Sequence, residues 1–166
     1  MHLRHDIIYS HLSILVLLEE YFERYIDKMK HIEVVAALIM HKEKILCMQR
    51  GESRHAYLTG KYEFPGGKIE QGETRTKALM RELNEEMELK VDIVEDDYFM
   101  SVHHTYPDFE ITMHCFLCRV TTKDFTRKEH IDHQWLLPTE ISTLDWAMAD
   151  KPIVDRISST GIKPWR

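Results

Sequence analysis

The segment GGKIEQGETRTKALMRELNEEMEL, residues 66–89, places Glu82, Glu85 and Glu86 at helical spacing. Carboxylates three or four residues apart on one helix repel each other, and a solvated helical face usually alternates them with Lys or Arg. A hard divalent cation neutralises such a cluster, since Mg²⁺ prefers oxygen ligands and commonly bridges to substrate phosphates. The pattern therefore indicates a Mg²⁺ site in which Mn²⁺ could substitute; the alternative is a solvated acidic face.

The helix that carries these glutamates is expected at residues 74–88, with Thr74 as its N-cap. On a wheel of about 3.6 residues per turn, the three carboxylates occupy an arc of about 100° beside an apolar arc of similar width. The apolar arc is the core face and contains Leu79, Met80, Leu83 and Met87. The carboxylates should therefore lie at the edge of the buried stripe, where strands and loops can enclose them.

Strand patterns precede this helix. Residues 32–40 form a β-branched apolar run without helical period, as in a strand buried on both faces, and residues 44–50 are expected to be its hairpin partner. A polar loop follows at residues 51–62. Residues 63–67 should break any regular element, because they contain Pro65 and two glycines.

The second half of the chain predicts a long antiparallel pair at residues 91–106 and 109–122, then a short strand at 133–137. A short helix should begin at Pro138–Glu140, and a last helix is expected at about 152–159. Strands and helices follow each other without a repeated βαβ unit. The expected fold class is therefore α/β in the broad sense (α+β), with a mixed sheet sandwiched between helices.

The composition is that of one ordinary globular domain. The chain has 166 residues, of which 43% are hydrophobic and 30% charged, enough for a single sizeable core. The formal net charge of −6 argues against non-specific nucleic-acid binding, yet a bound cation would still allow a phosphate substrate. Three cysteines are too few for a disulfide scaffold, so we expect buried or half-buried thiols in a reducing cytoplasm. Cys115 and Cys118 have an odd spacing in one strand pattern, which points them to opposite faces.

Residues 1–28 are expected to form an N-terminal helical extension that precedes a compact domain at residues 29–166. The apolar run from Ile7 to Leu18 is interrupted by Ser and His and is too short to span a bilayer. Two glutamates follow it where a signal peptide would carry a small-residue cleavage site. We therefore expect neither a membrane anchor nor a secretory leader in this segment.

The glutamate helix and the turn before it resemble the signature of the Nudix hydrolases. Gly67, five residues, Glu73, seven residues and then the run RELNEE at 81–86 match the Nudix box. The preceding EFPG at residues 63–66 is similar to the MutT-type branch of that family. Six fixed identities at these spacings make the resemblance specific.

The resemblance extends from about Val34 to Ile157 and implies a Nudix-type α/β/α sandwich with a mixed sheet. Glu88 departs from the pattern, because it stands where the box normally has a glycine; it should end the helix and ligate nothing. The implied activity is hydrolysis of an NTP or dNTP to the monophosphate and pyrophosphate, by metal-assisted attack of water at phosphorus. Enzymes of this branch remove unwanted nucleotides from the cellular pool.

The resemblance also implies roles for individual carboxylates. Glu85 and Glu86 resemble the principal metal ligands, with the backbone carbonyl of Gly66 beside them. Glu82 resembles the residue that ligates metal or takes the proton from the attacking water. Glu129 matches a distal glutamate that ligates metal or acts as the base. Which of Glu82 and Glu129 is the general base stays open.

Other positions are implied to support the catalytic group or to bind the substrate. Glu73 is similar to the outer carboxylate of the box and pairs with Arg81, so that the two hold the loop against the catalytic helix. Gly67 is the structural glycine of the box. Arg50 ends the second strand and is similar to an arginine that contacts substrate phosphates; its alternative is an exposed strand-end charge.

Asp150 aligns with the segment in which MutT-like enzymes read the base. An ionised aspartate only accepts hydrogen bonds, which suits an exocyclic amino group such as that of cytosine, whereas the oxidised-guanine enzyme has asparagine there. The expected substrate is therefore of the (d)CTP type or 8-oxo-dGTP. The alternative for Asp150 is a helix N-cap before Pro152. Tyr106 and Trp146 are candidates for stacking the base, or else core residues.

Two other functions stay open. One is a Nudix hydrolase that acts on a nucleotide sugar or a dinucleotide, and the other is a non-catalytic Nudix-like binding domain. The second is disfavoured because the box glutamates are complete. The expected partner is the nucleotide substrate, with no stable nucleic-acid partner and no membrane, and the protein is expected to be a monomer or homodimer.

Overall fold

The computed structural model describes Leu18, Phe22 and residues 30–162. The helical extension predicted at residues 1–28 and the boundary at residue 29 lie outside the described residues, apart from Leu18 and Phe22, whose side chains are exposed. Within the described part of the chain, no helix has the length and apolar character needed to cross a membrane.

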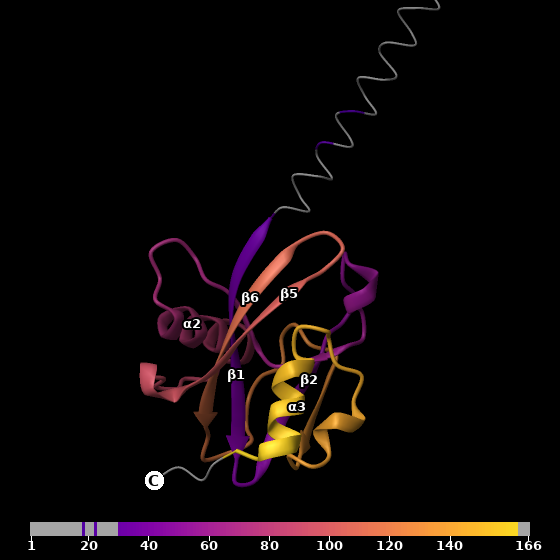
Figure 1. Cartoon of the computed structure of the whole chain (residues 1–166). Coiled ribbons are helices and arrows are strands. Elements are labelled where there is room, and N and C mark those ends of the chain that lie inside the picture. Colours follow the sequence, from indigo (N-terminus) through magenta and orange to yellow (C-terminus); the bar gives the residue numbers. More distant parts are fainter. Residues whose placement is uncertain (1–17, 19–21, 23–29, 163–166) are drawn as a thin grey trace, which may run out of the picture.

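The sheet is organised around strand β1, His31–His41, which pairs in parallel with β6, Glu110–Arg119, along almost its whole length. Strand β5, Tyr98–Thr105, pairs antiparallel with β6 and forms an edge of the sheet (Figure 1). The predicted long antiparallel pair is therefore confirmed. Its first strand begins later than the predicted residue 91, because Glu95–Asp97 form a 3₁₀ turn, η2.

On its other side, β1 has two short neighbours. Strand β4, Gly66–Lys68, pairs antiparallel with Val34–Ala36, and strand β2, Lys44–Gln49, forms the predicted hairpin with the end of β1. Strand β2 also pairs with β3, Tyr62–Glu63, and with β7, Asp132–Leu136. Parallel and antiparallel pairs together make the mixed sheet that the sequence predicts.

The prediction that residues 63–67 break any regular element is wrong. Tyr62–Glu63 and Gly66–Lys68 are paired strands on either side of Pro65. Proline needs no ladder partner for its nitrogen at this position, and the Pro65 carbonyl accepts a hydrogen bond from the Ala37 N–H at 2.8 Å. Pairing with distant strands thus overrides the local signal of proline and glycine.

Two α-helices cover opposite faces of the sheet (Figure 1). Helix α2, Arg75–Met87, begins at its predicted N-cap, where Thr74 Oγ1 accepts a hydrogen bond from the Lys77 N–H at 3.3 Å. Helix α3, Lys151–Thr160, has Pro152 in its first turn, as the sequence predicts. Two further 3₁₀ turns lie in the described part of the chain, η1 at Ala56–Leu58 and η3 at Ile141–Thr143.

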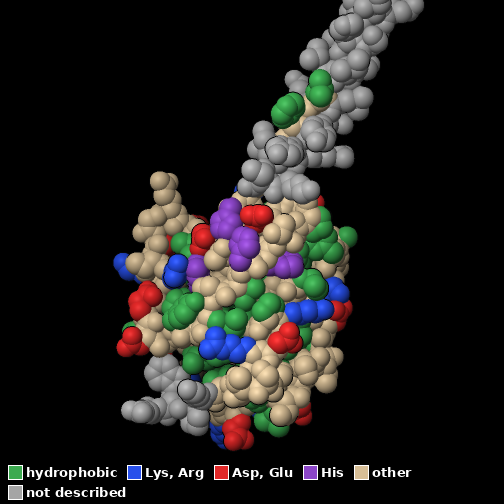
Figure 2. Space-filling view, viewed as in Figure 1, with side chains coloured by type: hydrophobic (Ala, Val, Ile, Leu, Met, Phe, Trp, Pro, Cys, Tyr) green, Lys and Arg blue, Asp and Glu red, His purple; other side chains and the backbone are tan. Residues whose placement is uncertain are grey.

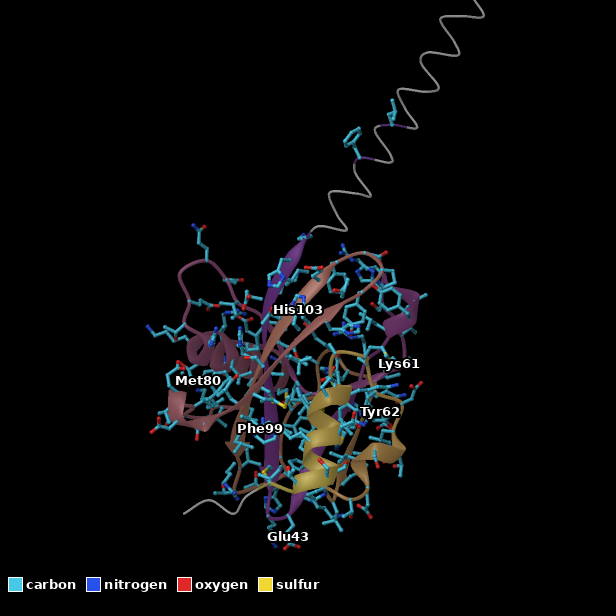
Figure 3. All side chains as sticks on the ribbon, in the orientation of Figure 1. Glu43, Lys61, Tyr62, Met80, Phe99 and His103 are labelled. Atoms are coloured by element: carbon cyan, nitrogen blue, oxygen red, sulfur yellow. The ribbon has the colours of Figure 1, made fainter. Side chains whose placement is uncertain are left out.

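Alternation along β1 divides the core between the two helices, because successive side chains of a strand point to opposite faces. Val35 and Ile39 pack in the cluster that contains α2, whereas Ala36 and Leu38 pack in the cluster that contains α3. Side chains fill the space between the sheet and both helices (Figure 3). The predicted Nudix-type sandwich is therefore the observed architecture.

The cysteines confirm the predicted alternation of β6. Cys115 packs in the cluster with α3 and Cys118 in the cluster with α2, so the two thiols lie on opposite faces. Both are buried, as is Cys47, and all three are free. Burial raises the pKa of the Cys47 and Cys118 thiols to about 12. These thiols are therefore structural apolar groups rather than nucleophiles.

A histidine patch covers the end of the sheet at which β1 begins (Figure 2). His31 stacks on His103, which Figure 3 labels on β5, with ring centroids 5.7 Å apart. The buried His114 is hydrogen-bonded to Glu33 at 2.6 Å and to Ser101 at 2.6 Å. The ring nitrogens of these histidines thus have hydrogen-bond partners at the end of the sheet, where the apolar core stops.

The packing of α2 on the sheet makes a first prediction. Leu83 is fully buried on the core face of the helix, and Leu83→Ala should lower the free energy of unfolding by about 2–5 kcal/mol, since a cavity is left behind. Asn84→Ala, at the next and exposed position, should change it by no more than about 0.5 kcal/mol. Urea unfolding of both variants checks this, and equal losses would contradict the assigned helix face.

Candidate active site

The first two residues of strand β4, Gly66 and Gly67, pass very close to strand β1 and to helix α2. Gly66 has φ +153°, and a Cβ atom there would collide with the Val35 carbonyl oxygen. A Cβ atom on Gly67 would collide with the carboxylate of Glu82. Both positions therefore require glycine, for backbone conformation at one and for space at both. This close approach brings the Gly66 carbonyl and the Glu82 carboxylate to the same part of the molecule.

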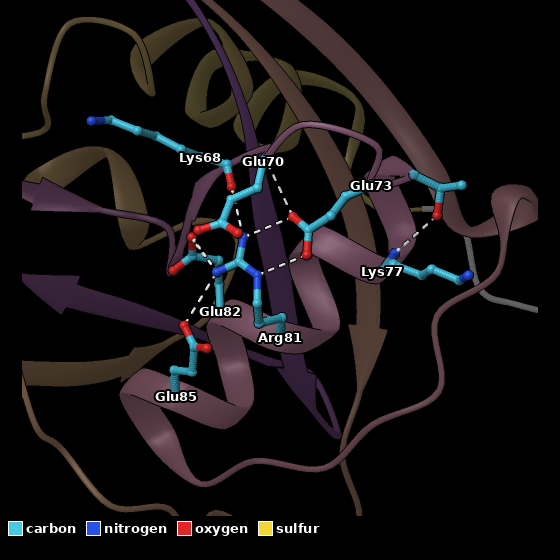
Figure 4. Close-up of polar contacts among 8 residues, drawn as sticks. Lys68, Glu70, Glu73, Lys77, Arg81, Glu82 and Glu85 are labelled. Carbon is cyan, nitrogen blue, oxygen red and sulfur yellow. Dashed lines mark hydrogen bonds and ion pairs between the residues drawn. The ribbon is translucent and has the colours of Figure 1, made fainter.

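Arg81 braces the turn against helix α2 (Figure 4). Its Nε and Nη2 donate to the two carboxylate oxygens of Glu73 at 2.8 and 2.9 Å, and Nη2 also donates to the Lys68 carbonyl at 2.9 Å. The hydrogen bond from Arg81 lowers the pKa of Glu73 to about 2, helped by the Glu70 N–H. Such bidentate geometry is specific to arginine, so Lys could not replace it.

The remaining nitrogen of Arg81 reaches two glutamates of the box. Nη1 lies 3.0 Å from Glu82 Oε1 and 3.2 Å from Glu85 Oε2 (Figure 4). Glu82 is largely buried, whereas Glu85 is exposed and does not line the cavity described below. Arg81 therefore contacts the carboxylates of Glu73, Glu82 and Glu85 from outside the cavity and can fix their orientation.

Glu86 is the least compensated carboxylate of the site. Its Oε2 is buried and has no hydrogen-bond partner among the described residues. Burial and, to a smaller extent, the nearby carboxylates of Glu129, Glu82 and Glu63 together raise the pKa of Glu86 to about 8. An unpartnered buried oxygen among carboxylates suits a divalent cation, which would replace the missing partner and offset the repulsion. The residues present thus fit the implied metal in chemical type, since Glu82, Glu86, Glu129 and Gly66 line one cavity. Among the described residues, no three acidic, histidine or cysteine side chains are already grouped closely enough to form a complete metal site.

Arg50 is held by a residue that sequence reasoning did not single out. Its Nε and Nη2 donate to Glu63 Oε2 at 2.8 and 2.6 Å, and His130 Nε2 lies 2.9 Å from Glu63 Oε1. Glu63 and His130 are nearly buried, while the Arg50 side chain is partly exposed. Glu63 thus links the arginine to the residue next to Glu129. The available signal was adjacency, since Glu63 opens the EFPG run and His130 follows Glu129.

Asp150 lines the same cavity and is buried, with 5% of its surface exposed. Its Oδ1 accepts a hydrogen bond from the Phe64 N–H at 3.0 Å, and its side chain makes no cap bond to α3, although the residue occupies the N-cap position. Asp150 is therefore the N-cap residue of α3, as the alternative predicts, but its side chain bonds to Phe64 instead of capping the helix. Burial raises the pKa of Asp150 to about 8, so this carboxyl can carry a proton near neutral pH, whereas its residue type alone predicts an ionised acceptor.

A cavity of about 610 Å³ connects these groups. Of the predicted site residues, it is lined by Arg50, Gly66, Gly67, Glu82, Glu86, Glu129 and Asp150, whereas Glu73, Arg81 and Glu85 lie outside it. Of the two aromatic candidates, Tyr106 lines the cavity and accepts a hydrogen bond from the Ala149 N–H at 3.2 Å. Trp146 is a core residue that packs on Phe64.

The rim of the cavity is closed by a contact between two loops. Asp108, in the turn between β5 and β6, lies 2.8 Å from His55 Nδ1 and accepts a hydrogen bond from the Tyr57 hydroxyl at 3.0 Å. Tyr57 stacks on Tyr106, with ring centroids 5.4 Å apart. The loop after β2, which lines the cavity at residues 50–55, is thereby joined to the turn between β5 and β6.

Comparison with known proteins assigns the family. Residues 34–156 match a family model described as NUDIX domain. The CTP pyrophosphohydrolase of Escherichia coli strain K12 is 36% identical over 131 residues, 76% of this chain and 91% of that protein. The 8-oxo-dGTP diphosphatase of Proteus vulgaris is 35% identical over 101 residues, 60% of this chain and 87% of that protein. The solution structure of the E. coli ORF135 protein matches with a TM-score of 0.68 at 30% identity, covering 82% of this chain and 96% of that one. The chain therefore belongs to the Nudix family of hydrolases.

The raised pKa of Asp150 makes the stability of the protein depend on pH. The folded pKa is about 8, above the ordinary value of 3.8, so the folded state keeps a proton that the unfolded chain releases. The resulting stabilisation is complete below the unfolded pKa and is lost as pH rises through about 8. Between pH 5 and 8, wild type should lose stability relative to Asp150→Asn by up to about 1.4 kcal/mol per pH unit.

Urea unfolding of the metal-free protein from pH 5 to 9 measures this difference. Asp145→Asn is the matched control, because Asp145 is exposed and pairs with Lys61 at the surface. Parallel pH profiles for wild type and Asp150→Asn would show that Asp150 is ionised in the folded protein.

Proposed function

We propose that this protein is a Mg²⁺-dependent nucleoside triphosphate pyrophosphohydrolase, which converts an NTP or dNTP and water to the monophosphate and pyrophosphate. The observation that carries the proposal is the buried Oε2 of Glu86, unpartnered among the described residues and placed with Glu82 and Glu129 on a cavity wall. Arg50, on the same cavity, supplies a donor for phosphate oxygens.

The residues of the chain divide the work as follows. Glu82, Glu86, Glu129 and the Gly66 carbonyl would hold Mg²⁺. The resemblance also implies Glu85 as a principal ligand, but its side chain is exposed, pairs with Arg81 and lies outside the cavity, so it would bind the cation from the outer side. When bound, the cation offsets triphosphate charge, acidifies water at neutral pH and stabilises the departing oxyanion. Either Glu82 or Glu129 accepts the proton of the attacking water, because both carboxylates line the cavity.

Arg50 binds the phosphates in a fixed orientation. Glu63 holds its Nε and Nη2, which fixes the plane of the guanidinium before substrate arrives. His130 holds the other oxygen of Glu63, so the arginine and the loop of Glu129 share one support. Arg50 and the loop of Glu129 are thus already in place when the triphosphate binds.

Asp150 reads the base. A protonated carboxyl both donates and accepts, like an amide, whereas an ionised one only accepts. The neutral form suits a base edge with a carbonyl acceptor, as in 8-oxoguanine, and the ionised form suits the amino group of cytosine. The similar proteins named for 8-oxo-dGTP and CTP support these two substrate types for this chain. In either case the role is nucleotide-pool cleaning.

We also propose a cellular setting and a domain division for this enzyme. The negative net charge and the three free buried thiols support a cytoplasmic protein without a stable nucleic-acid partner or membrane contact. We propose residues 29–166 as the catalytic domain and residues 1–28 as a helical extension. A monomer or homodimer is expected.

Pyrophosphate release tests the activity directly. With Mg²⁺ and a panel of CTP, dCTP, 8-oxo-dGTP and plain purine triphosphates, at least one substrate should yield pyrophosphate, and EDTA should abolish the reaction. Glu86→Gln should lower kcat/KM by at least about 100-fold, because the site loses a cation-binding charge. Glu70→Gln, which removes the same charge at an exposed position on the cavity rim, should stay within a few-fold of wild type. Turnover of nucleotide sugars or dinucleotides alone would redirect the assignment within the family.

The protonation of Asp150 predicts a pH-dependent base preference. The ratio of kcat/KM for 8-oxo-dGTP to that for CTP should fall as pH rises through about 8, since the donor proton is then lost. Asp150→Asn keeps a donor at every pH and should make the ratio independent of pH. Because both substrates share the same triphosphate chemistry, the ratio cancels changes at the metal site. An unchanged ratio in wild type between pH 6 and 9 would argue against Asp150 as the reader.

A further inference from the structure

Glu88 combines an unfavourable backbone conformation with a well-placed side chain. It ends helix α2 with φ +53°, in the left-handed region, where a side chain is disfavoured and glycine is the usual residue. The Nudix pattern normally has glycine at this position. A glutamate here therefore keeps a strained conformation that glycine would relieve.

The Glu88 carboxylate binds the loop that carries Glu129. Thr126 Oγ1 donates to Glu88 Oε2 at 2.8 Å, and Lys128 Nζ lies 3.0 Å from Glu88 Oε1. These contacts lower the pKa of Glu88 below its usual range. Both oxygens of the carboxylate are thus engaged by one short segment, whose next residue is Glu129.

The backbone of the same segment also pairs with the end of α2. The Thr126 N–H donates to the Met87 carbonyl at 3.0 Å, and the Lys128 N–H donates to the Glu86 carbonyl at 3.2 Å. Helix carbonyls at a C-terminus lack intrahelical partners, so the loop satisfies groups that would otherwise need water. The Glu129 loop is therefore joined to the helix of its partner glutamates by side-chain and backbone bonds together.

This tether opposes a specific electrostatic force. Glu129 and Glu86 are close enough for their carboxylates to repel when both are ionised, and Glu86 Oε2 has no hydrogen-bond partner among the described residues. Without a restraint, the pair would relieve this repulsion by protonation of Glu86, whose pKa is raised to about 8, or by movement of the loop away from the helix. On the far side of Glu129, the Ile131 N–H donates to the Gln49 carbonyl at 3.0 Å, so both flanks of Glu129 are held.

We propose that Glu88 is a positioning residue, which through Thr126 and Lys128 holds Glu129 beside Glu86 in the metal-free enzyme and so prepares the cation site. The inference deepens the proposed function and rests on it. The competing explanation is an exposed ion pair without consequence, since exposed pairs contribute little to stability and both side chains are partly solvated. The two explanations differ in what they predict for metal affinity.

The direction in which Lys128→Ala changes the metal affinity distinguishes a positioning role from a purely electrostatic one. Removing a cation near a cation site should tighten metal binding if charge alone matters. If Lys128 restrains Glu129, Lys128→Ala should instead weaken binding. Thr126→Val changes no charge and should also weaken it. Lys123→Ala is the matched control, since it removes the same charge from the same loop at a residue that lies over the Trp135 ring.

The measurement is Mn²⁺ binding to the full-length, nucleotide-free protein, followed by the electron paramagnetic resonance signal of free Mn²⁺. Lys128→Ala, Thr126→Val and Glu88→Gly should each raise the dissociation constant for Mn²⁺ by roughly 3- to 10-fold. This effect is smaller than is usual for residues that support metal ligands, because the side chains of the tether are partly exposed. Glu88→Gly should do so without loss of thermal stability, because it also relieves the left-handed strain. Backbone amide exchange at Thr126 and Lys128 should accelerate in the metal-free variants.

The outcomes separate the two proposals. Unchanged or tighter Mn²⁺ binding in Lys128→Ala and Thr126→Val, with wild type still hydrolysing triphosphates, would overturn the positioning role alone. A wild-type protein that neither binds Mn²⁺ nor releases pyrophosphate would overturn the proposed function and the tether with it. Weaker binding in all three variants but not in Lys123→Ala supports the tether.

Discussion

The site depends on the close passage of the Gly66–Gly67 backbone between strand β1 and the carboxylate of Glu82. A side chain at Gly66 would collide with the backbone of strand β1, and a side chain at Gly67 would displace the carboxylate of Glu82. Both glycines line the cavity together with Glu82 and Glu86. The carboxylates of the box can therefore share one cavity only while these two positions carry no side chain.

Repulsion among carboxylates is the second constraint on this structure. Two cations lie on the outer side of the acidic group, where Arg81 holds Glu73 and Lys128 pairs with Glu88, and a third, Arg50, lines the cavity and pairs with Glu63. The described interior around Glu86 keeps an excess of negative charge, which raises the pKa of that residue. A rigid frame with a negative interior is a general way to create affinity for a divalent cation, because the cost of assembling the ligands is met by folding.

Local patterns predicted the elements better than their partners. The α2 helix, its Thr74 cap and the buried character of β1 follow from side-chain period and capping chemistry, both properties of adjacent residues. The sequence did not predict strands β3 and β4. Their stability comes from pairing with β2 and β1, and this pairing leaves no pattern in short segments rich in proline and glycine. The supports Glu63 and His130 were missed for a similar reason, since their roles exist only through contacts with each other and with Arg50.

The sequence alone determined the Nudix box, the identity of its carboxylates and the helix that carries them. It also determined the alternation of side chains along the core strands. Residue spacing and periodicity express these features directly. The tertiary structure decided which carboxylate is left without a partner and which residues brace the others. It also decided the protonation of Asp150, whose type predicts an ionised acceptor but whose burial raises its pKa to about 8. Desolvation and mutual repulsion depend on what lies around a group in space, and residue order along the chain does not contain that information.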